Sequence, residues 1–156
     1  MASESDLRPS RPLPREGATR LRVRYCECDP FGVVHHASYV AWLEIARTEM
    51  LREGGVTYGQ MEAAGVFLVI AGLEIKYRRP GRYDDLLDVH CRVTGGSKVK
   101  LEHEYEVRLV ERVAADVERL REAGEDVLIV AKTTLVCVGA DVKVRGLPEW
   151  MVAREQ

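Results

Sequence analysis

The change in hydrophobic spacing along the chain is the feature that most limits its fold. From Ser38 to about Glu53, apolar residues recur every three or four positions, which predicts one amphipathic helix of about four turns. Beyond residue 66 the spacing becomes two almost to the end, which predicts long β-strands. One helix followed by a run of strands predicts an α+β protein, in which a helix packs on a sheet, and not an alternating α/β fold.

Turn residues separate the expected strands. Strands are predicted over 19–28, 67–78, 87–93, 99–109 and 127–138. Arg79-Pro80-Gly81 and Gly95-Gly96 are typical of the turns between them. Short helices are expected at 58–64 and, exposed to solvent, at 112–123. An open sheet with one helix leaves an edge and an uncovered face, so we expect the chain to self-associate.

The expected helix has an apolar stripe and a polar face. Its stripe consists of Tyr39, Trp42, Leu43, Ala46, Met50 and Leu51. Ser38 is placed to cap the start of the helix, and Gly54-Gly55 is placed to end it. On the polar face, Glu44 and Arg47 are three residues apart, a spacing that favours an ion pair.

Length and charge exclude several classes of protein. The 156 residues suit one domain, and a net charge of −2 argues against a general nucleic-acid binder. The longest apolar run, residues 66–71, is too short to span a bilayer. Residues 1–17 hold three prolines and scattered apolar side chains, which predicts a flexible tail with no secretory signal, followed by a domain over 18–152. The four cysteines suit free thiols, so we expect a cytoplasmic protein with no metal site.

The segment from Tyr25 to Tyr39 concentrates the side chains that are capable of chemistry. Asp29 follows the first expected strand, a turn at Gly32 comes next, and the helix begins nine residues after Asp29. The exposed N–H groups at a helix start can stabilise the negative charge that develops in acyl transfer. A carboxylate such as Asp29 can attack a carbonyl or activate a water molecule. A turn in which Asp29 bonds its own backbone, with His36 as a packing residue, explains the same residues equally well.

A longer pattern supports the chemical interpretation. The run Tyr25-x-x-x-Asp29-Pro-x-Gly32-Val33-Val34-x-His36-Ala37-Ser38-Tyr39, followed by Glu44-x-Ala46-Arg47, resembles the signature of the 4-hydroxybenzoyl-CoA thioesterase family. The likeness is nearest to its Tol-Pal-associated branch. It implies a hotdog fold over residues 18–152, with a long central helix wrapped by an antiparallel sheet of about five strands. It also implies an acyl-CoA thioesterase that needs no cofactor, with active sites between the subunits of a homodimer or homotetramer.

The resemblance implies roles for individual residues. Asp29 would act as nucleophile or general base, with His36 and Tyr25 as the other catalytic candidates. The oxyanion site would use the helix start and the backbone amides of Gly32, Val34 and His36. The turn after Gly95-Gly96 would meet the CoA phosphates. The CoA-binding candidates are Ser97, Lys98, Lys100 and, from another turn, Arg82.

Two other functions remain open from the sequence. A thioesterase acting on acyl carrier protein would need a basic surface patch, because carrier proteins are acidic. The first strand and residues 78–82 supply arginines for such a patch: Arg20, Arg22, Arg24, Arg78, Arg79 and Arg82. A non-catalytic acyl-CoA-binding module would bind the thioester without releasing CoA. Residues 112–125 form a longer connection than a hairpin requires. Because this inserted segment departs from the family pattern, the resemblance does not identify the acyl group of the substrate.

Overall fold

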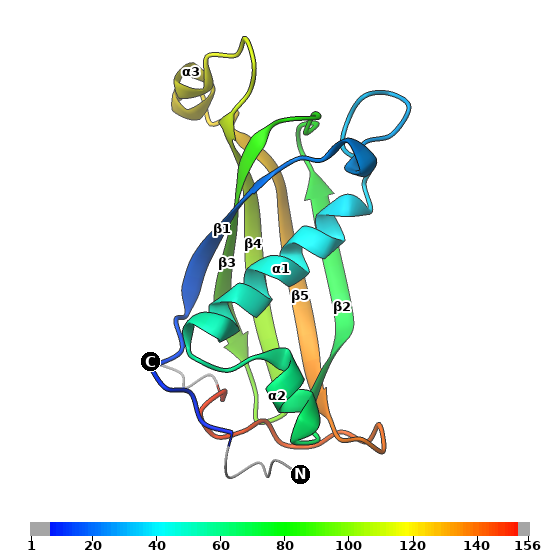
Figure 1. Cartoon of the computed structure of the whole chain (residues 1–156), viewed down its shortest axis with the longest axis vertical. Helices are drawn as coiled ribbons and strands as arrows, with labels where there is room; N and C mark the ends of the chain where they lie inside the picture. The colour runs from blue at the N-terminus through cyan, green and yellow to red at the C-terminus, as the bar shows by residue number, and fades with distance from the viewer. Residues whose placement is uncertain (1–6, 153–156) are drawn as a thin grey trace.

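One long helix lies across one face of a five-stranded antiparallel sheet (Figure 1). The computed structural model describes residues 7–152. Its strands are β1 Glu16–Arg22, β2 Phe67–Tyr77, β3 Leu86–Gly96, β4 Lys100–Glu111 and β5 Val127–Val138. Its α-helices are α1 Ser38–Glu53, α2 Tyr58–Ala63 and α3 Val117–Glu122, and a 3-10 turn spans Tyr25–Glu27. The expected α+β hotdog architecture, a long helix wrapped by five antiparallel strands, is confirmed.

The order of the strands across the sheet differs from their order along the chain. The sheet runs β1-β3-β4-β5-β2, so β2 pairs with β5 and not with β3, which follows it in the sequence. Residues 78–85 carry the chain past the ends of β5 and β4. The backbone amides of Arg78 and Arg79 donate to the carbonyl of Leu128 along that path. The two edges of the sheet are therefore β1 and β2.

The helix buries the predicted stripe. All six stripe residues are at most 6% exposed, and they pack mainly on the inward faces of β3, β4 and β5. Ser38 does not cap the helix as expected. It is the first helical residue, Ala37 is in the cap position, and the Ser38 hydroxyl donates to the carbonyl of Glu27. Arg47 also differs from expectation, because the structure buries it to 9% exposure although its position suggested the polar face.

The first strand is shorter than its alternating pattern suggests. β1 ends at Arg22, and the chain then turns through Tyr25–Glu27 where a strand as far as Cys28 was expected. The turn forms because the buried carboxylate of Glu27 accepts a hydrogen bond from the backbone amide of Arg24 at 2.7 Å. Val23 is buried as predicted, but Tyr25 is 81% exposed.

The start of the domain also differs from expectation. Residues 7–17 lie against the domain where a flexible tail over 1–17 was expected, and β1 begins at Glu16, inside that range. Leu7 is 7% exposed, because it packs with Leu51 and Met61 in a second apolar cluster. The amide of Arg11 donates to a carbonyl at the end of α1. Residues 1–6 of the expected tail lie outside the described residues.

Candidate active site

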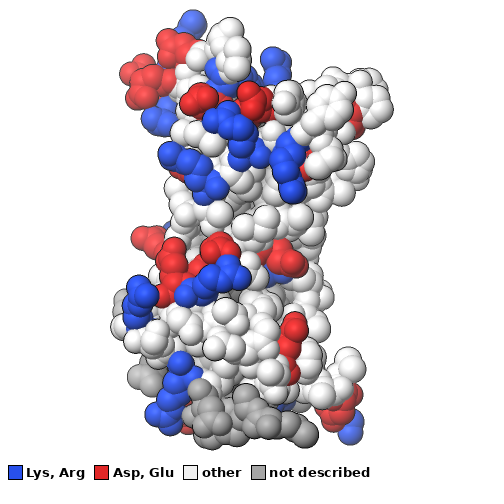
Figure 2. Space-filling view, in the orientation of Figure 1, with Lys and Arg blue, Asp and Glu red and all other residues white. Residues whose placement is uncertain are grey.

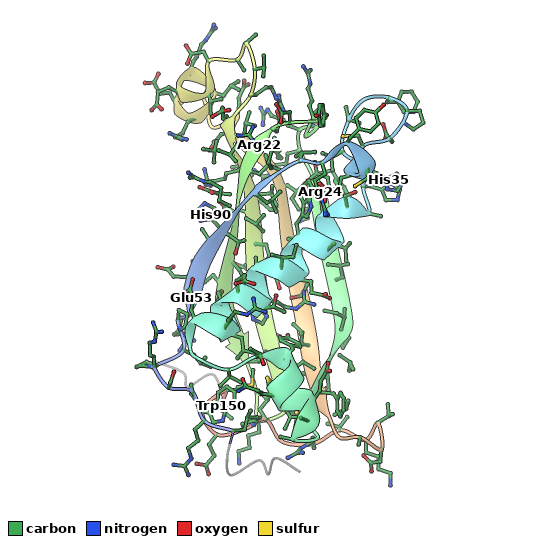
Figure 3. All side chains as sticks on the ribbon, viewed as in Figure 1. Arg22, Arg24, His35, Glu53, His90 and Trp150 are labelled. Atoms are coloured by element: carbon green, nitrogen blue, oxygen red, sulfur yellow. The ribbon has the colours of Figure 1, made fainter. Side chains whose placement is uncertain are left out.

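The loop between the 3-10 turn and α1 brings Asp29 close to the start of the helix. The loop folds as a tight hairpin, in which the Asp29 amide donates to the carbonyl of Val33 at 2.9 Å. Gly32 sits at the tip with φ of +76°, a conformation that a side chain would strain. Cys28 pairs with Val34 at the base of the hairpin. The helix start therefore follows directly on the hairpin that carries Asp29 (Figure 3 labels His35 at this end).

The Asp29 side chain keeps one carboxylate oxygen available. Its Oδ1 accepts a hydrogen bond from the Phe31 amide at 2.8 Å, so the local turn that the sequence allowed does form. Within residues 7–152, no hydrogen bond reaches Oδ2, and the residue is half-buried. The turn orients the carboxylate and leaves an oxygen free for chemistry, so the structural and the chemical interpretations of Asp29 are compatible.

The expected oxyanion amides are not equivalent. The Gly32 amide donates to the carbonyl of Asp29 at 2.9 Å, and the Val34 amide donates to the carbonyl of Gly81 at 2.8 Å. Both hydrogens are thus engaged in holding the loop, which argues against Gly32 and Val34 as oxyanion donors. The His36 amide, by contrast, makes no hydrogen bond with any described residue. It is the one expected donor that remains available, two residues before α1.

Glu27 anchors the loop, and sequence reasoning missed it. Its buried carboxylate accepts hydrogen bonds from the Trp42 indole at 2.9 Å and from the amide and guanidinium of Arg24, each at 2.7 Å. Its backbone carbonyl accepts from the His35 amide at 2.8 Å. Burial raises the pKa of Glu27, but the bonds from Arg24 and Trp42 outweigh burial and hold the pKa below its ordinary value. The signal in the sequence was a glutamate between Tyr25 and Asp29 within a run expected to be half-buried.

A second turn supports the loop from the opposite side. Gly81 approaches so closely that a Cβ there would lie 2.9 Å from Val34 and 3.0 Å from the Tyr39 hydroxyl. That hydroxyl accepts a hydrogen bond from the Gly81 amide. Asp85, at 1% exposure, fixes this turn through a bidentate pair with Arg112 at 2.7 and 2.9 Å. The pair joins the 78–85 turn to the segment after β4.

The aromatic candidates lie on the surface of this end of the molecule. Tyr25 stacks edge-on against Tyr83 with ring centroids 5.6 Å apart. The rings of His35 and His36 stack at 4.1 Å, and both residues are exposed. The Tyr77 hydroxyl, at the end of edge strand β2, donates to the His36 carbonyl at 2.9 Å. The site therefore borders the β2 edge of the sheet.

The CoA-binding candidates fall into two groups. Arg82 is beside the loop, because it pairs with Val33 across a β-bridge. Ser97 and Lys98 lie in the β3–β4 turn, at the opposite end of β3, and Lys100 is the first residue of β4. The ten steps from Leu86 to Gly96 correspond to roughly 33 Å. A single chain therefore does not bring these three residues to Asp29.

The arginines of the expected basic patch are mostly paired with carboxylates. Arg20 pairs with Asp88 at 2.8 Å, Arg24 with Glu27 at 2.7 Å and Arg79 with Glu125 at 3.2 Å. Arg22 lies 3.6 Å from each of two carboxylates. Figure 2 shows basic and acidic side chains mixed on the face it displays. Four of the six arginines are therefore paired, whereas Arg78 and Arg82 make no ion pair with a described residue.

The described part of the chain has neither a membrane-spanning helix nor a group of side chains arranged for a metal ion. Over residues 7–152, no helix has both the length and the apolar character needed to cross a bilayer. The same residues contain no cluster of three or more His, Cys, Asp or Glu side chains arranged to hold a metal ion.

Comparison with known proteins identifies relatives over most of the chain. A family model described as "Thioesterase-like superfamily" matches residues 23–154. The acyl-CoA thioester hydrolase YbgC of Escherichia coli O6:H1 is 34% identical over 134 residues, which cover 85% of this chain and 90% of YbgC. A hypothetical protein of Aquifex aeolicus, AQ1494, has a solved structure with a TM-score of 0.73 at 28% identity, covering 85% of this chain and 94% of that one. The DHNA-CoA thioesterase of Staphylococcus aureus has a TM-score of 0.73 at 23% identity over 87% of this chain and 83% of its own, which is a likeness of fold.

Proposed function

The chain belongs to the thioesterase-like superfamily and is a thioester hydrolase, and from that premise we propose that it hydrolyses an acyl-CoA to a free acid and CoA. YbgC, with which it shares 34% identity, carries that activity in its name. The observation that carries the proposal is one loop that holds a half-buried carboxylate, Asp29, close in the chain to an unpaired amide, His36. The run from Tyr25 to Arg47 further supports placing it in the 4-hydroxybenzoyl-CoA thioesterase family, near the Tol-Pal-associated branch.

In the proposed reaction Asp29 supplies the base or the nucleophile. As a base, its free oxygen takes a proton from water while the hydroxyl adds to the thioester carbonyl. The C–S bond then breaks, and the CoA sulfur leaves with the proton. As a nucleophile, Asp29 would instead form a mixed anhydride, expel CoA and be released by water. Neither route draws on a metal or redox cofactor.

The start of α1 supplies the complementary charge. Both routes place negative charge on the former carbonyl oxygen, and the His36 amide is available to donate a hydrogen bond to that oxygen. The N-terminal end of the 16-residue helix adds a partial positive charge. Glu27, Tyr77 and Gly81 hold the loop in this arrangement through the bonds described above. We propose that His36 and Tyr25 border the acyl group and the CoA of the bound substrate.

We propose that the active unit is a homodimer formed through the β2 edges. An unpaired edge strand is a template for pairing, and β2 exposes the apolar residues Val69, Ile70, Leu73 and Tyr77. The other edge, β1, carries Arg20 and Arg22 in ion pairs instead. A twofold axis through paired β2 strands reverses the second copy end for end. The partner's β3–β4 turn, with its Ser97, Lys98 and Lys100, would then lie at the end that holds Asp29.

The remaining assignments follow from this geometry. Arg82 of one chain and the lysines of the other would meet the CoA phosphates, which suits the phosphate-binding role of both side chains. The paired arginines offer no specific support for acyl carrier protein as the carrier. The four cysteines are free thiols in the described chain, which supports a location in the reducing cytoplasm.

The test compares an Asp29→Asn variant with the natural chain on a panel of acyl-CoA substrates. CoA release is followed by chromatography, because exposed Cys26 would react with a thiol reagent. We expect turnover to fall by about 10²- to 10⁴-fold. Asp141→Asn is the matched control, because Asp141 Oδ1 accepts an amide two residues on, as Asp29 does, in a turn that lies after β5. Turnover of Asp29→Asn within fivefold of the natural chain would rule out the assigned role, and tight acyl-CoA binding with no CoA release by the natural chain would favour a binding module.

A further inference from the structure

A second cavity lies between the C-terminal half of α1 and the sheet, away from Asp29. Its volume is about 470 Å³, within the range that holds small organic ligands. None of its lining residues belongs to the loop between Tyr25 and Ala37. Figure 3 shows Trp150, which lines the cavity, at the end of the molecule opposite His35. Within one chain, the cavity therefore lies apart from the loop that carries Asp29.

Arg47 presents a buried positive charge to this cavity. The residue is 9% exposed, and its Nε has no hydrogen-bond partner in the described chain. Its ion-pair partner, Glu44, lies 3.2 Å from the guanidinium but has a side chain that is 67% exposed. Burial lowers the pKa of Arg47, but the Tyr58 and Tyr105 hydroxyls more than offset burial, so the guanidinium stays charged. Glu44 and the two hydroxyls leave Nε without a partner, and an unsatisfied donor on a buried charged group is unfavourable.

His103 is the second polar group without a partner. It lines the same cavity from β4, is 7% exposed, and its Nδ1 makes no hydrogen bond in the described chain. Burial, followed by the charge of Arg47, lowers the pKa of His103 to about 4, so the ring is neutral at pH 7. A neutral imidazole can donate one hydrogen bond to an anion without adding a second buried charge.

The rest of the cavity wall is mainly apolar. Its apolar members include Met50, Leu51, Leu68, Val93, Leu101 and Trp150. The other charged lining residues, Arg15 and Glu149, are exposed. The cavity therefore combines the buried cation of Arg47, two neutral donors, His103 and the Tyr58 hydroxyl, and an apolar surface.

We propose that this cavity binds a carboxylic acid with an apolar body, whose carboxylate pairs with Arg47 and His103. A carboxylate supplies acceptors for both unmatched groups and balances the buried charge, since guanidinium and carboxylate form strong, directional pairs. The apolar body of the acid then covers the apolar wall. A cation would be repelled by Arg47, and an uncharged alcohol would offer the buried guanidinium no carboxylate beyond the exposed Glu44.

The test measures binding by calorimetry, with octanoate as the probe, and does not depend on turnover. We expect saturable binding of one octanoate per chain and at least tenfold weaker binding of octan-1-ol, which has the same chain without the charge. Arg47→Met keeps the length and apolar stem of the side chain, and we expect it to weaken octanoate binding about tenfold or more. Arg52→Met, on the exposed face of the same helix, is the matched control and should bind octanoate as the natural chain does.

Two further variants test whether octanoate occupies this cavity and whether its binding is independent of Asp29. Leu68→Trp fills the cavity while retaining Arg47, so it should lose octanoate binding in a chain whose circular dichroism is unchanged. Asp29→Asn should retain octanoate binding, which separates this cavity from the hydrolytic site. Equal octanoate affinity in the natural chain and Arg47→Met, or no saturable binding by the natural chain, would overturn the proposal.

Discussion

Replacing Glu27 with alanine should destabilise the chain and disable the loop that carries Asp29. Glu27 touches no substrate in the proposed reaction, so it acts as a positioning residue. Its carboxylate accepts hydrogen bonds from three donors, which are the Arg24 amide, the Arg24 guanidinium and the buried Trp42 indole. Alanine removes all three acceptors at once and leaves the indole N–H of Trp42, a residue that is 1% exposed, without a partner.

The expected loss of stability in Glu27→Ala follows from the groups that the substitution leaves unpaired. An unsatisfied buried donor costs about 1–3 kcal/mol, which applies to the Trp42 indole. Loss of the bond to the Arg24 amide, which closes the 3-10 turn, costs about 1 kcal/mol, as for a helix cap. The Arg24 guanidinium is exposed and adds little. The free energy of unfolding should therefore fall by about 2–4 kcal/mol, and Tm by about 5–15 °C for a domain of this size.

Thermal unfolding followed by circular dichroism, together with CoA release, tests this reasoning. Glu27→Gln keeps an acceptor for Trp42, so it should lose less Tm than Glu27→Ala, while Glu53→Ala at the exposed end of α1 should leave Tm unchanged. At a temperature where Glu27→Ala is folded, its turnover should fall at least tenfold. A Tm within 2 °C of the natural chain, or full turnover with a lowered Tm, would refute the positioning role.

The pH dependence of Glu27 provides an independent check. Because the folded state holds the pKa of Glu27 below its ordinary value, the ionised carboxylate stabilises the fold above that ordinary value. This stabilisation is lost as the pH falls through the lowered pKa. The difference in Tm between the natural chain and Glu27→Gln should therefore be largest near pH 7 and shrink toward pH 3.

Two other predictions concern His103 and the β2 edge. The fold lowers the pKa of His103 to about 4, whereas in the unfolded chain its pKa is about 6.5. Protonation below pH 6.5 therefore favours the unfolded chain, and His103 should account for a loss of about 3 kcal/mol of stability between pH 7 and pH 4. Urea unfolding at both pH values should show that His103→Phe lacks this part of the loss, and an equal loss in both proteins would contradict it. Leu73→Glu, on the exposed part of β2, should sediment as one 17.6-kDa chain with reduced turnover, whereas Ala18→Glu on the β1 edge should sediment as a dimer. A natural chain that sediments as a monomer would refute the proposed interface.

Most of the secondary structure could be predicted from hydrophobic spacing. The helix over 38–53 and the strand over 127–138 have the bounds that their patterns predict, because each buries one continuous face. The first strand could not be bounded in this way. Its alternation continues to Tyr25, but the bond between Glu27 and the Arg24 amide turns the chain and exposes Tyr25. Local spacing carries no information about a side chain that captures the backbone.

The candidate site was predictable in part. The signature between Tyr25 and Tyr39 located Asp29 and the helix start, because both lie in one continuous segment of the chain. The signature did not show that the amides of Gly32 and Val34 donate hydrogen bonds to the carbonyls of Asp29 and Gly81. One of those carbonyls comes from a turn almost fifty residues away, so only the folded chain reveals the bond.

The long helix, its buried stripe, the long strands and the segment that carries Asp29 can all be predicted from residue spacing, since each depends on residues that are near in the chain. Tertiary packing separates β2 from β3, its neighbour in the chain, and makes β2 an apolar edge, since strand order depends on contacts between distant segments. It also decided that Arg47, on a helix face that appeared polar, is buried beside His103. Residue spacing sets which side chains share a face, but only packing sets what that face meets.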